Sequence, residues 1–180
     1  MTTGHVFIAT SLDGYVARED HQIDWLIKYD SNGEDHGYDA FIADKDCLVM
    51  GRGSYETVRG FSEWPYNIPV IVMSKSLSQN DIPIELKDKI EISTSSPAEL
   101  MQALENRGWK KAYIDGGKLV QSFIREGFVT DLCITTIPIL IGNGISLFGH
   151  INADIDLELK NSQSFQTGMV QSLYAIKNRL

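Results

Sequence analysis

Two glycines that flank an arginine are the first residues whose types and spacing could do chemistry. Residues 47–50 form an apolar run, and Gly51-Arg52-Gly53-Ser54 follows it directly. Glycine lets backbone N–H groups approach a ligand closely, a helix N-terminus carries partial positive charge, and a guanidinium is a planar donor for phosphate oxygens. The segment therefore predicts a strand that leads into a phosphate-sized turn, with a short helix over residues 54–59 behind it.

A second glycine turn and a serine-lysine pair lie further along the chain. Asp115-Gly116-Gly117-Lys118 follows the strand-like residues 111–114 and precedes apolar residues at helical spacing. Ser74-Lys75 follows residues 69–73, an apolar run with the length of a central parallel strand. Open α/β sheets bind ligands at the carboxyl ends of their strands. Arg52, Lys75 and Lys118 are therefore the candidate cations for an anionic small ligand.

The composition limits the classes of partner that the chain can have. The formal net charge is −8, a sign that repels nucleic acid and anionic membranes. No apolar run reaches the roughly 18–20 residues that span a bilayer, and the N-terminus has no charged region of the kind that begins a signal peptide. We therefore expect one domain over residues 1–180, cytoplasmic, with a small-molecule substrate and neither nucleic acid nor membrane as partner.

The remaining reactive residue types do not predict a metal site or a nucleophile. Cys47 and Cys133 lie in apolar runs, where a buried thiol is commoner than a disulfide. The histidines are scattered along the chain, so we expect no bound metal. Asp13 precedes Gly14, and this pair is interpreted as a structural turn because such turns need no chemistry to explain them.

The elements that must position these residues alternate along the chain. Strand-like and helix-like segments alternate up to Glu126, and strand-like segments dominate afterwards. Residues 18–37 are polar and are expected to form a loop over the ligand site. Residues 157–164 and 170–177 are expected to pair as a hairpin. The pattern predicts an α/β fold whose mixed sheet has a parallel core and an antiparallel C-terminal edge.

Taken in order, the motifs resemble those of the dihydrofolate reductase-like superfamily. The resemblance covers nearly the whole chain and is closest to the branch that holds the reductase domain of bacterial riboflavin biosynthesis and its stand-alone relatives. It implies a three-layer α/β/α fold and a homodimer. The stretches that carry it are Ser11-Leu12-Asp13-Gly14-Tyr15-Val16-Ala17, Val49-Met50-Gly51-Arg52, Ile114-Asp115-Gly116-Gly117-Lys118-Leu119 and Ile137-Pro138-Ile139-Leu140-Ile141-Gly142-Asn143-Gly144.

The resemblance also implies that the cofactor is NADPH, held across the carboxyl ends of the strands. Three cationic side chains around one nucleotide favour NADPH over NADH, because each could bind the additional phosphate. The positions that match the nicotinamide pocket are Ala9, Val16 and Ala17. Those that match the phosphate-binding turns are Gly51, Arg52, Gly53, Ser54, Ser74, Lys75, Ile114, Gly116, Gly117, Lys118 and Leu119.

Asp115 conflicts with a phosphate site, because a carboxylate beside a pyrophosphate would repel it. Folate reductases carry a further glycine at the matching position. We expect Asp115 to point away from the ligand and to cap the helix that begins near Gly117.

The substrate side is less well defined by the sequence. Folate reductases use a buried carboxylate with a raised pKa to support protonation of the imine, and either Asp30 or Asp35 could match it. Thr135 matches the strand hydroxyl beside that carboxylate. Trp25, Tyr38 and Phe41 are candidates for substrate contact, with core or lid packing as the alternative.

The resemblance implies an NADPH-dependent reductase. Its substrate would be dihydrofolate-like, or the pyrimidine ribosylamine phosphate of riboflavin synthesis. The alternative is a family member that binds NADPH without turnover.

Overall fold

The computed structural model describes residues 1–29 and 34–177. Ten strands form within these residues. Nine of them lie where apolar or alternating runs predict strands, and the two-residue strand β8 was not predicted. They are β1 (Thr3–Ser11), β2 (Tyr15–Ala17), β3 (Cys47–Gly51), β4 (Val70–Met73), β5 (Ile90–Ser93), β6 (Lys111–Asp115), β7 (Val129–Ile137), β8 (Ile145–Ser146), β9 (Leu157–Ser164) and β10 (Val170–Ile176).

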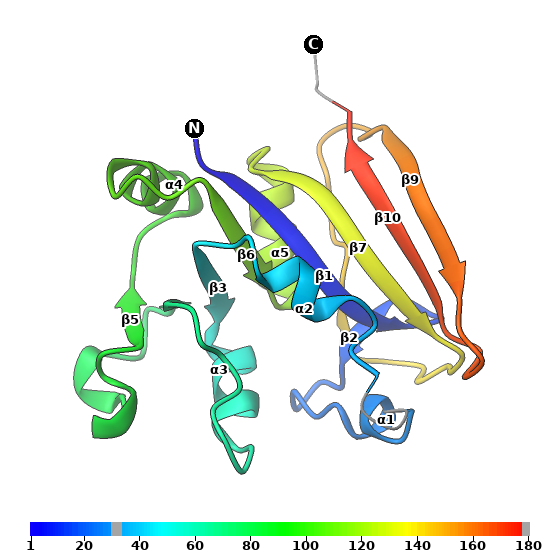
Figure 1. The fold of residues 1–180 in the computed structure, drawn as a ribbon, viewed down its shortest axis with the longest axis horizontal. Coiled ribbons are helices and arrows are strands. Elements are labelled where there is room, and N and C mark those ends of the chain that lie inside the picture. The colour runs from blue at the N-terminus through cyan, green and yellow to red at the C-terminus, as the bar shows by residue number, and fades with distance from the viewer. Residues whose placement is uncertain (30–33, 178–180) are drawn as a thin grey trace.

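The main sheet has eight strands in the order β5-β4-β3-β6-β1-β7-β10-β9 (Figure 1). Neighbouring strands from β5 to β7 run parallel, whereas β10 is antiparallel to both β7 and β9. The predicted mixed sheet with a parallel core and an antiparallel C-terminal edge is confirmed. A separate two-stranded sheet pairs β2 with β8.

The helices are short and connect these strands. Two 3-10 helices, η1 (Gln79–Asp81) and η2 (Ile84–Leu86), follow β4. The α-helices are α1 (Asp24–Ile27), α2 (Tyr38–Ile42), α3 (Arg52–Arg59), α4 (Pro97–Asn106) and α5 (Gly117–Arg125). The loop expected over residues 18–37 therefore contains one turn of helix, α1. The helix after the first glycine turn begins at Arg52 rather than at Ser54.

Two apolar layers cover the opposite faces of the sheet, because residues alternate between faces along each strand. In β3, Cys47 and Val49 pack against α4 and α5, whereas Leu48 and Met50 pack against α2 and α3. Figure 1 shows α2 in front of the sheet and α5 behind it. The predicted three-layer α/β/α arrangement is confirmed, and β1, β3 and β6 lie side by side at its centre.

Candidate active site

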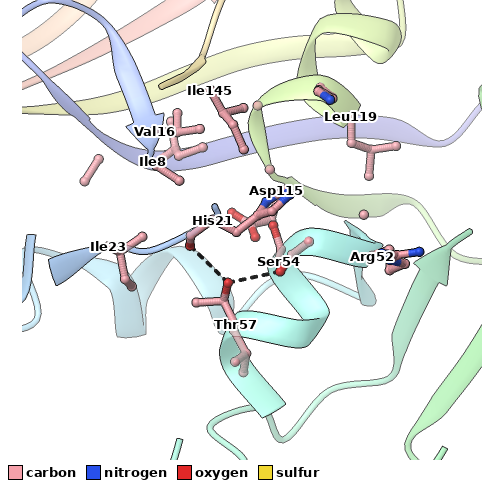
Figure 2. Close-up of a pocket in the computed structure, with 18 of the residues that line it drawn as sticks. Ile8, Val16, His21, Ile23, Arg52, Ser54, Thr57, Asp115, Leu119 and Ile145 are labelled. Carbon is pink, nitrogen blue, oxygen red and sulfur yellow. Dashed lines mark hydrogen bonds between the residues drawn. The ribbon is translucent and has the colours of Figure 1, made fainter. Parts of the chain in front are cut away.

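A cavity of about 670 Å³ opens at the edge of the sheet where the parallel strands end. Strands β3 and β6 deliver their last residues to it, β1 contributes residues 7–9, and helices α3 and α5 begin at it (Figure 2). Its lining residues are Phe7, Ile8, Ala9, Val16, Ala17, His21, Ile23, Leu26, Gly51, Arg52, Gly53, Ser54, Thr57, Val58, Phe61, Tyr66, Met73, Tyr113, Asp115, Gly116, Gly117, Lys118, Leu119, Ser122 and Ile145.

Two helix N-termini converge on this cavity. Gly116 adopts a φ of +95°, and a Cβ there would lie 2.7 Å from Ser54 Oγ, so the starts of α5 and α3 almost touch. A Cβ at Gly117 would lie 2.7 Å from the Ser146 carbonyl oxygen. The first N–H groups of a helix have no partner within the helix and attract anions. The glycines therefore bring two anion-attracting ends close to one another.

Gly51 differs from those glycines because neither its conformation nor its packing requires glycine. Its φ of −81° and ψ of 167° suit any residue. A Cβ built there would meet no atom within 4 Å. Gly51 nevertheless lines the cavity at the point where α3 begins. The missing side chain leaves open space through which a ligand can reach the backbone.

Two of the three cations expected at the site line the cavity, and the third does not. Arg52 lines the cavity, donates from Nη1 to Ser76 Oγ at 2.9 Å, and pairs through Nε with Glu56 at 3.0 Å. Lys118 also lines the cavity and is exposed. Lys75 is exposed but is not among the lining residues.

Two further residues that match the phosphate-binding turns also lie outside the cavity wall. The Ser74 hydroxyl accepts the N–H groups of Ser76 and Leu77 within its own turn, so Ser76 is the hydroxyl beside Arg52. Ile114 is fully buried in the core. Every other predicted cofactor-binding residue lines the cavity.

Asp115 faces the cavity, which corrects the expectation that it points away and caps α5. The N-cap of α5 is Gly116, and no side chain caps this helix. Figure 2 shows Asp115 among the lining side chains, near Ser54. Burial raises the pKa of the Asp115 carboxyl, although hydrogen bonds from the Ser54 side chain, the Gly116 N–H and Tyr113 partly offset this effect. The strand direction and these neighbours, rather than local capping, decide its orientation.

Asp35, one of the two predicted carboxylates, does not have the surroundings of a buried acid. It is exposed, and its oxygens accept the N–H groups of Gly37 and Asp39 at 3.0 and 2.9 Å, which holds the start of α2. The N–H groups of Asp39 and Gly37 lower the pKa of the Asp35 carboxyl, which is the opposite of what the role requires. Asp30, the other candidate, lies outside the described residues.

Thr135 is a buried residue of β7 and does not line the cavity. Its Oγ1 accepts from Gln171 Nε2 at 3.0 Å, and the same amide donates to the carbonyl oxygen of His36. His36 precedes α2 and has a positive φ of 52°. Thr135 and Gln171 therefore connect β7 and β10 to the segment that leads into α2.

The three aromatic residues proposed for substrate contact lie behind the cavity wall. Trp25 is 1% exposed and packs in a cluster with Ile137 and Met169. Tyr38 and Phe41 pack edge-on or tilted against Phe7, which does line the cavity. All three side chains pack against the apolar core, which is the alternative role expected for them. Their contact with a substrate stays a prediction.

His21 is a cavity residue that the sequence did not single out. It adopts a positive φ of 69°, and its ring packs over Gly53 so closely that a Cβ on that glycine would clash with it. Thr57 Oγ1 donates to the His21 carbonyl oxygen at 3.2 Å (Figure 2). The loop before α1 is thus fastened to α3, a tertiary contact that has no signal in the local sequence.

Other cavity residues were missed because they lie in loops or on buried strands. Phe61 and Tyr66 line the cavity and follow α3 closely, and together with Trp64 they form an aromatic group in a loop, which was the available signal. Within residues 1–29 and 34–177, no cluster of three or more His, Cys, Asp or Glu side chains could hold a metal ion. The same residues contain no helix that is both long and apolar enough to cross a membrane.

Comparison with known proteins places this geometry in a family. The model of the RibD C-terminal domain family matches residues 3–171. The chain belongs to this family. It is 32% identical to the uncharacterized protein YwjB of Bacillus subtilis (strain 168) over 164 residues, which covers 89% of this chain and 90% of YwjB.

Solved structures agree with this membership of the RibD C-terminal domain family. A putative riboflavin biosynthesis protein from Shewanella sp. PV-4 superposes with a TM-score of 0.91 at 34% identity, covering 98% of this chain and 100% of that one. A diaminohydroxyphosphoribosylaminopyrimidine deaminase/5-amino-6-(5-phosphoribosylamino)uracil reductase from Thermotoga maritima gives 0.71 at 13% identity, covering 98% of this chain and 57% of that one. The dihydrofolate reductase-like fold is confirmed.

Proposed function

We propose that this protein is an NADPH-dependent reductase that transfers hydride to a C=N or C=O carbon of a small pterin- or pyrimidine-type molecule. The observation that carries the proposal is the cavity at which α3 and α5 both begin, with Gly51 leaving open space at one helix start. The chain belongs to the RibD C-terminal domain family, whose members are typically reductases of riboflavin synthesis, and this membership supports the proposal.

The residues around the cavity fit this cofactor. The N–H groups at the starts of α3 and α5 would bind the pyrophosphate, and a proton on Asp115, which burial favours, would reduce the repulsion expected there. Arg52 with Ser76 would bind the 2′-phosphate. Ala9, Val16 and Ala17 would surround the nicotinamide. The planar guanidinium of Arg52 presents a rigid fork of donors that matches phosphate geometry, which favours NADPH over NADH.

Asp115 would assist the chemistry. Bound NADPH supplies a hydride to the carbon of the double bond, and the nitrogen or oxygen of that bond then takes up one proton. A carboxyl whose pKa is raised by burial holds its proton over a wider pH range than an exposed carboxyl, and it can donate that proton. Asp115 would regain a proton from water, which balances the reduction.

The test follows NADPH absorbance with dihydrofolate and with 5-amino-6-(5-phosphoribosylamino)uracil, alongside NADPH and NADH binding. Arg52→Ala should weaken the binding of NADPH at least tenfold more than it weakens the binding of NADH. Arg59→Ala, on the same helix but outside the cavity, should change neither. Micromolar NADPH binding without oxidation by either compound would favour a binding protein without turnover on them. Failure to bind NADPH would refute the proposal.

A further inference from the structure

The cavity has two chemically different ends, and α3 runs between them. Arg52 is the first residue of α3, and Lys118 lies in the first turn of the neighbouring α5. Val58 lies in the last turn of α3, and Phe61 follows the helix. A helix of 8 residues is about 12 Å long, so the cations and Phe61 lie at opposite ends.

The rest of the lining includes a group of aromatic and aliphatic side chains, of which α3 places Val58 and Phe61 farthest from the cations. We call this group the aromatic end; its members are Phe7, Ile23, Leu26, Val58, Phe61, Tyr66 and Tyr113. Tyr113 is held in place because its hydroxyl donates to the Phe7 carbonyl oxygen at 2.8 Å. Tyr66 packs edge-on against Trp64, with ring centroids 5.4 Å apart. These contacts give the aromatic end fixed walls.

Among the described residues that line the cavity, no lysine or arginine lies at the aromatic end. Among the lining residues, the only lysine and arginine are Lys118 and Arg52, both at the glycine turns. Residues 30–33 read Asp-Ser-Asn-Gly, so they add no basic side chain. Asp115 joins the two ends, because it accepts a hydrogen bond from the Ser54 side chain at the start of α3 while the Tyr113 hydroxyl lies 3.4 Å from its Oδ1. A phosphate placed here would face a carboxyl group and no counter-charge.

We propose that the aromatic end binds an unphosphorylated, uncharged planar heterocycle, whose hydrogen-bonding edge meets Asp115. This inference deepens the proposed function, on which it rests for the assignment of the other end to NADPH. Flat rings gain from stacking and edge contacts with Phe61 and Tyr66, and a neutral ring incurs little desolvation cost there. The substrate class therefore differs from the phosphoribosylamino compound for which the Thermotoga maritima reductase is named.

Asp115 would set the orientation of the ring. Its raised pKa keeps a proton on the carboxyl over a wider pH range, so it can donate to a ring nitrogen or oxygen and accept from a neighbouring N–H. A phosphorylated ribose would have to lie against tyrosines that burial keeps neutral, such as Tyr66.

The test is equilibrium binding to the full chain, measured by calorimetry both without cofactor and with saturating NADP⁺, which cannot deliver hydride. The probes are 6-methylpterin, 5-amino-6-(5-phosphoribosylamino)uracil and the same uracil after enzymatic removal of its phosphate. We expect 6-methylpterin and the dephosphorylated compound to bind. The phosphorylated compound should bind less than threefold more tightly than the dephosphorylated one. Tenfold or tighter binding of the phosphorylated compound would overturn the inference, and so would no binding of either unphosphorylated ring.

Two variants locate the ring. Phe61→Ala should weaken 6-methylpterin about threefold to tenfold and leave the NADP⁺ affinity within twofold. Phe148→Ala is the matched control, because Phe148 is 49% exposed, like Phe61 at 45%, but lies outside the cavity. Equal effects of the two variants would contradict the placement. If the rings bind and NADP⁺ does not, the proposed function fails while the ring site stands.

Discussion

Gly51 is the residue whose identity says most about the ligand. Its backbone is ordinary and no atom crowds its missing Cβ, so folding alone does not require glycine there. We predict that Gly51→Ala leaves the melting temperature within about 2 °C and weakens NADPH at least tenfold, because the methyl group occupies the space through which a phosphate would approach. Thermal denaturation and fluorescence titration measure the two effects.

Gly117→Ala is the contrasting control for that experiment. A Cβ at Gly117 would lie 2.7 Å from the Ser146 carbonyl oxygen and 2.9 Å from a Val16 methyl group, so this variant should lose stability. If Gly51→Ala were the destabilising change and kept its NADPH affinity, a ligand-based reason for Gly51 would be wrong.

Asp115 should make stability fall as pH rises. Its pKa is raised in the folded protein, so between the unfolded and folded pKa values the folded state binds more protons, and the free energy of unfolding decreases with increasing pH. We predict that Asp115→Asn is more stable than the parent at pH 7 and that this gain shrinks as pH falls toward about 4. Urea denaturation across this pH range measures the difference.

Asp35→Asn should change the stability in the opposite direction, so that this variant is less stable than the parent at pH 7. The Asp35 pKa is lowered by N–H donors, so its stabilising contribution is present at pH 7 and is lost on acidification. The same sign for both variants would contradict the opposed surroundings that the structure gives these two carboxyl groups.

At the scale of elements, the start of α2 depends on Asp35 for structure. Asp35→Ala removes two hydrogen bonds from the helix start, and we expect the melting temperature to fall by about 2–4 °C. The steady-state rate of NADPH oxidation should stay within twofold, because Asp35 lies outside the cavity wall. A hundredfold loss of rate at unchanged stability would restore Asp35 as the proton-supporting acid.

Elements with local signals were predictable from the sequence. Ser96 and Glu99 form a capping box at the start of α4, a pattern visible in the sequence Ser96-Pro97-Ala98-Glu99, and the C-terminal segments expected to form a hairpin pair as β9 and β10. The start of α3 was placed two residues late because glycine is a poor helix former, although Gly53 lies in its first turn and Gly51 supplies the extended N-cap.

Side chains oriented by tertiary contacts were not predictable in the same way. The glycine turns and Arg52 were found because their chemistry is local to the strand ends. The sequence showed that the Asp115 carboxylate conflicts with a phosphate site, but the predicted orientation of its side chain was wrong. Its hydrogen-bond partners Ser54 and Tyr113 belong to α3 and β6, and the sequence did not reveal these contacts. The long distance in sequence between β1, α3 and β6 also hid the aromatic end of the cavity.

At the scale of the whole molecule, β9 leaves one edge of the sheet open. All its residues are exposed, and within residues 1–29 and 34–177 no strand pairs with its outer side. An open edge of this length is commonly protected by another element or chain. The homodimer implied by the resemblance stays a prediction, which sedimentation equilibrium tests against the 20.1 kDa mass of one chain.

NADPH should stabilise the whole fold, because its proposed site joins β1, β3 and β6 through α3 and α5 and does not exist in the unfolded chain. At 100 times its dissociation constant, a ligand stabilises the folded state by about 2.7 kcal/mol. For a chain of this size, that raises the melting temperature by about 5–11 °C. We expect NADH at the same concentration to give a clearly smaller rise, and Arg52→Ala to reduce the NADPH effect to that of NADH. Equal rises with both nucleotides in the parent protein would argue against Arg52 as the selector of the 2′-phosphate, even if the cofactor site itself is correct.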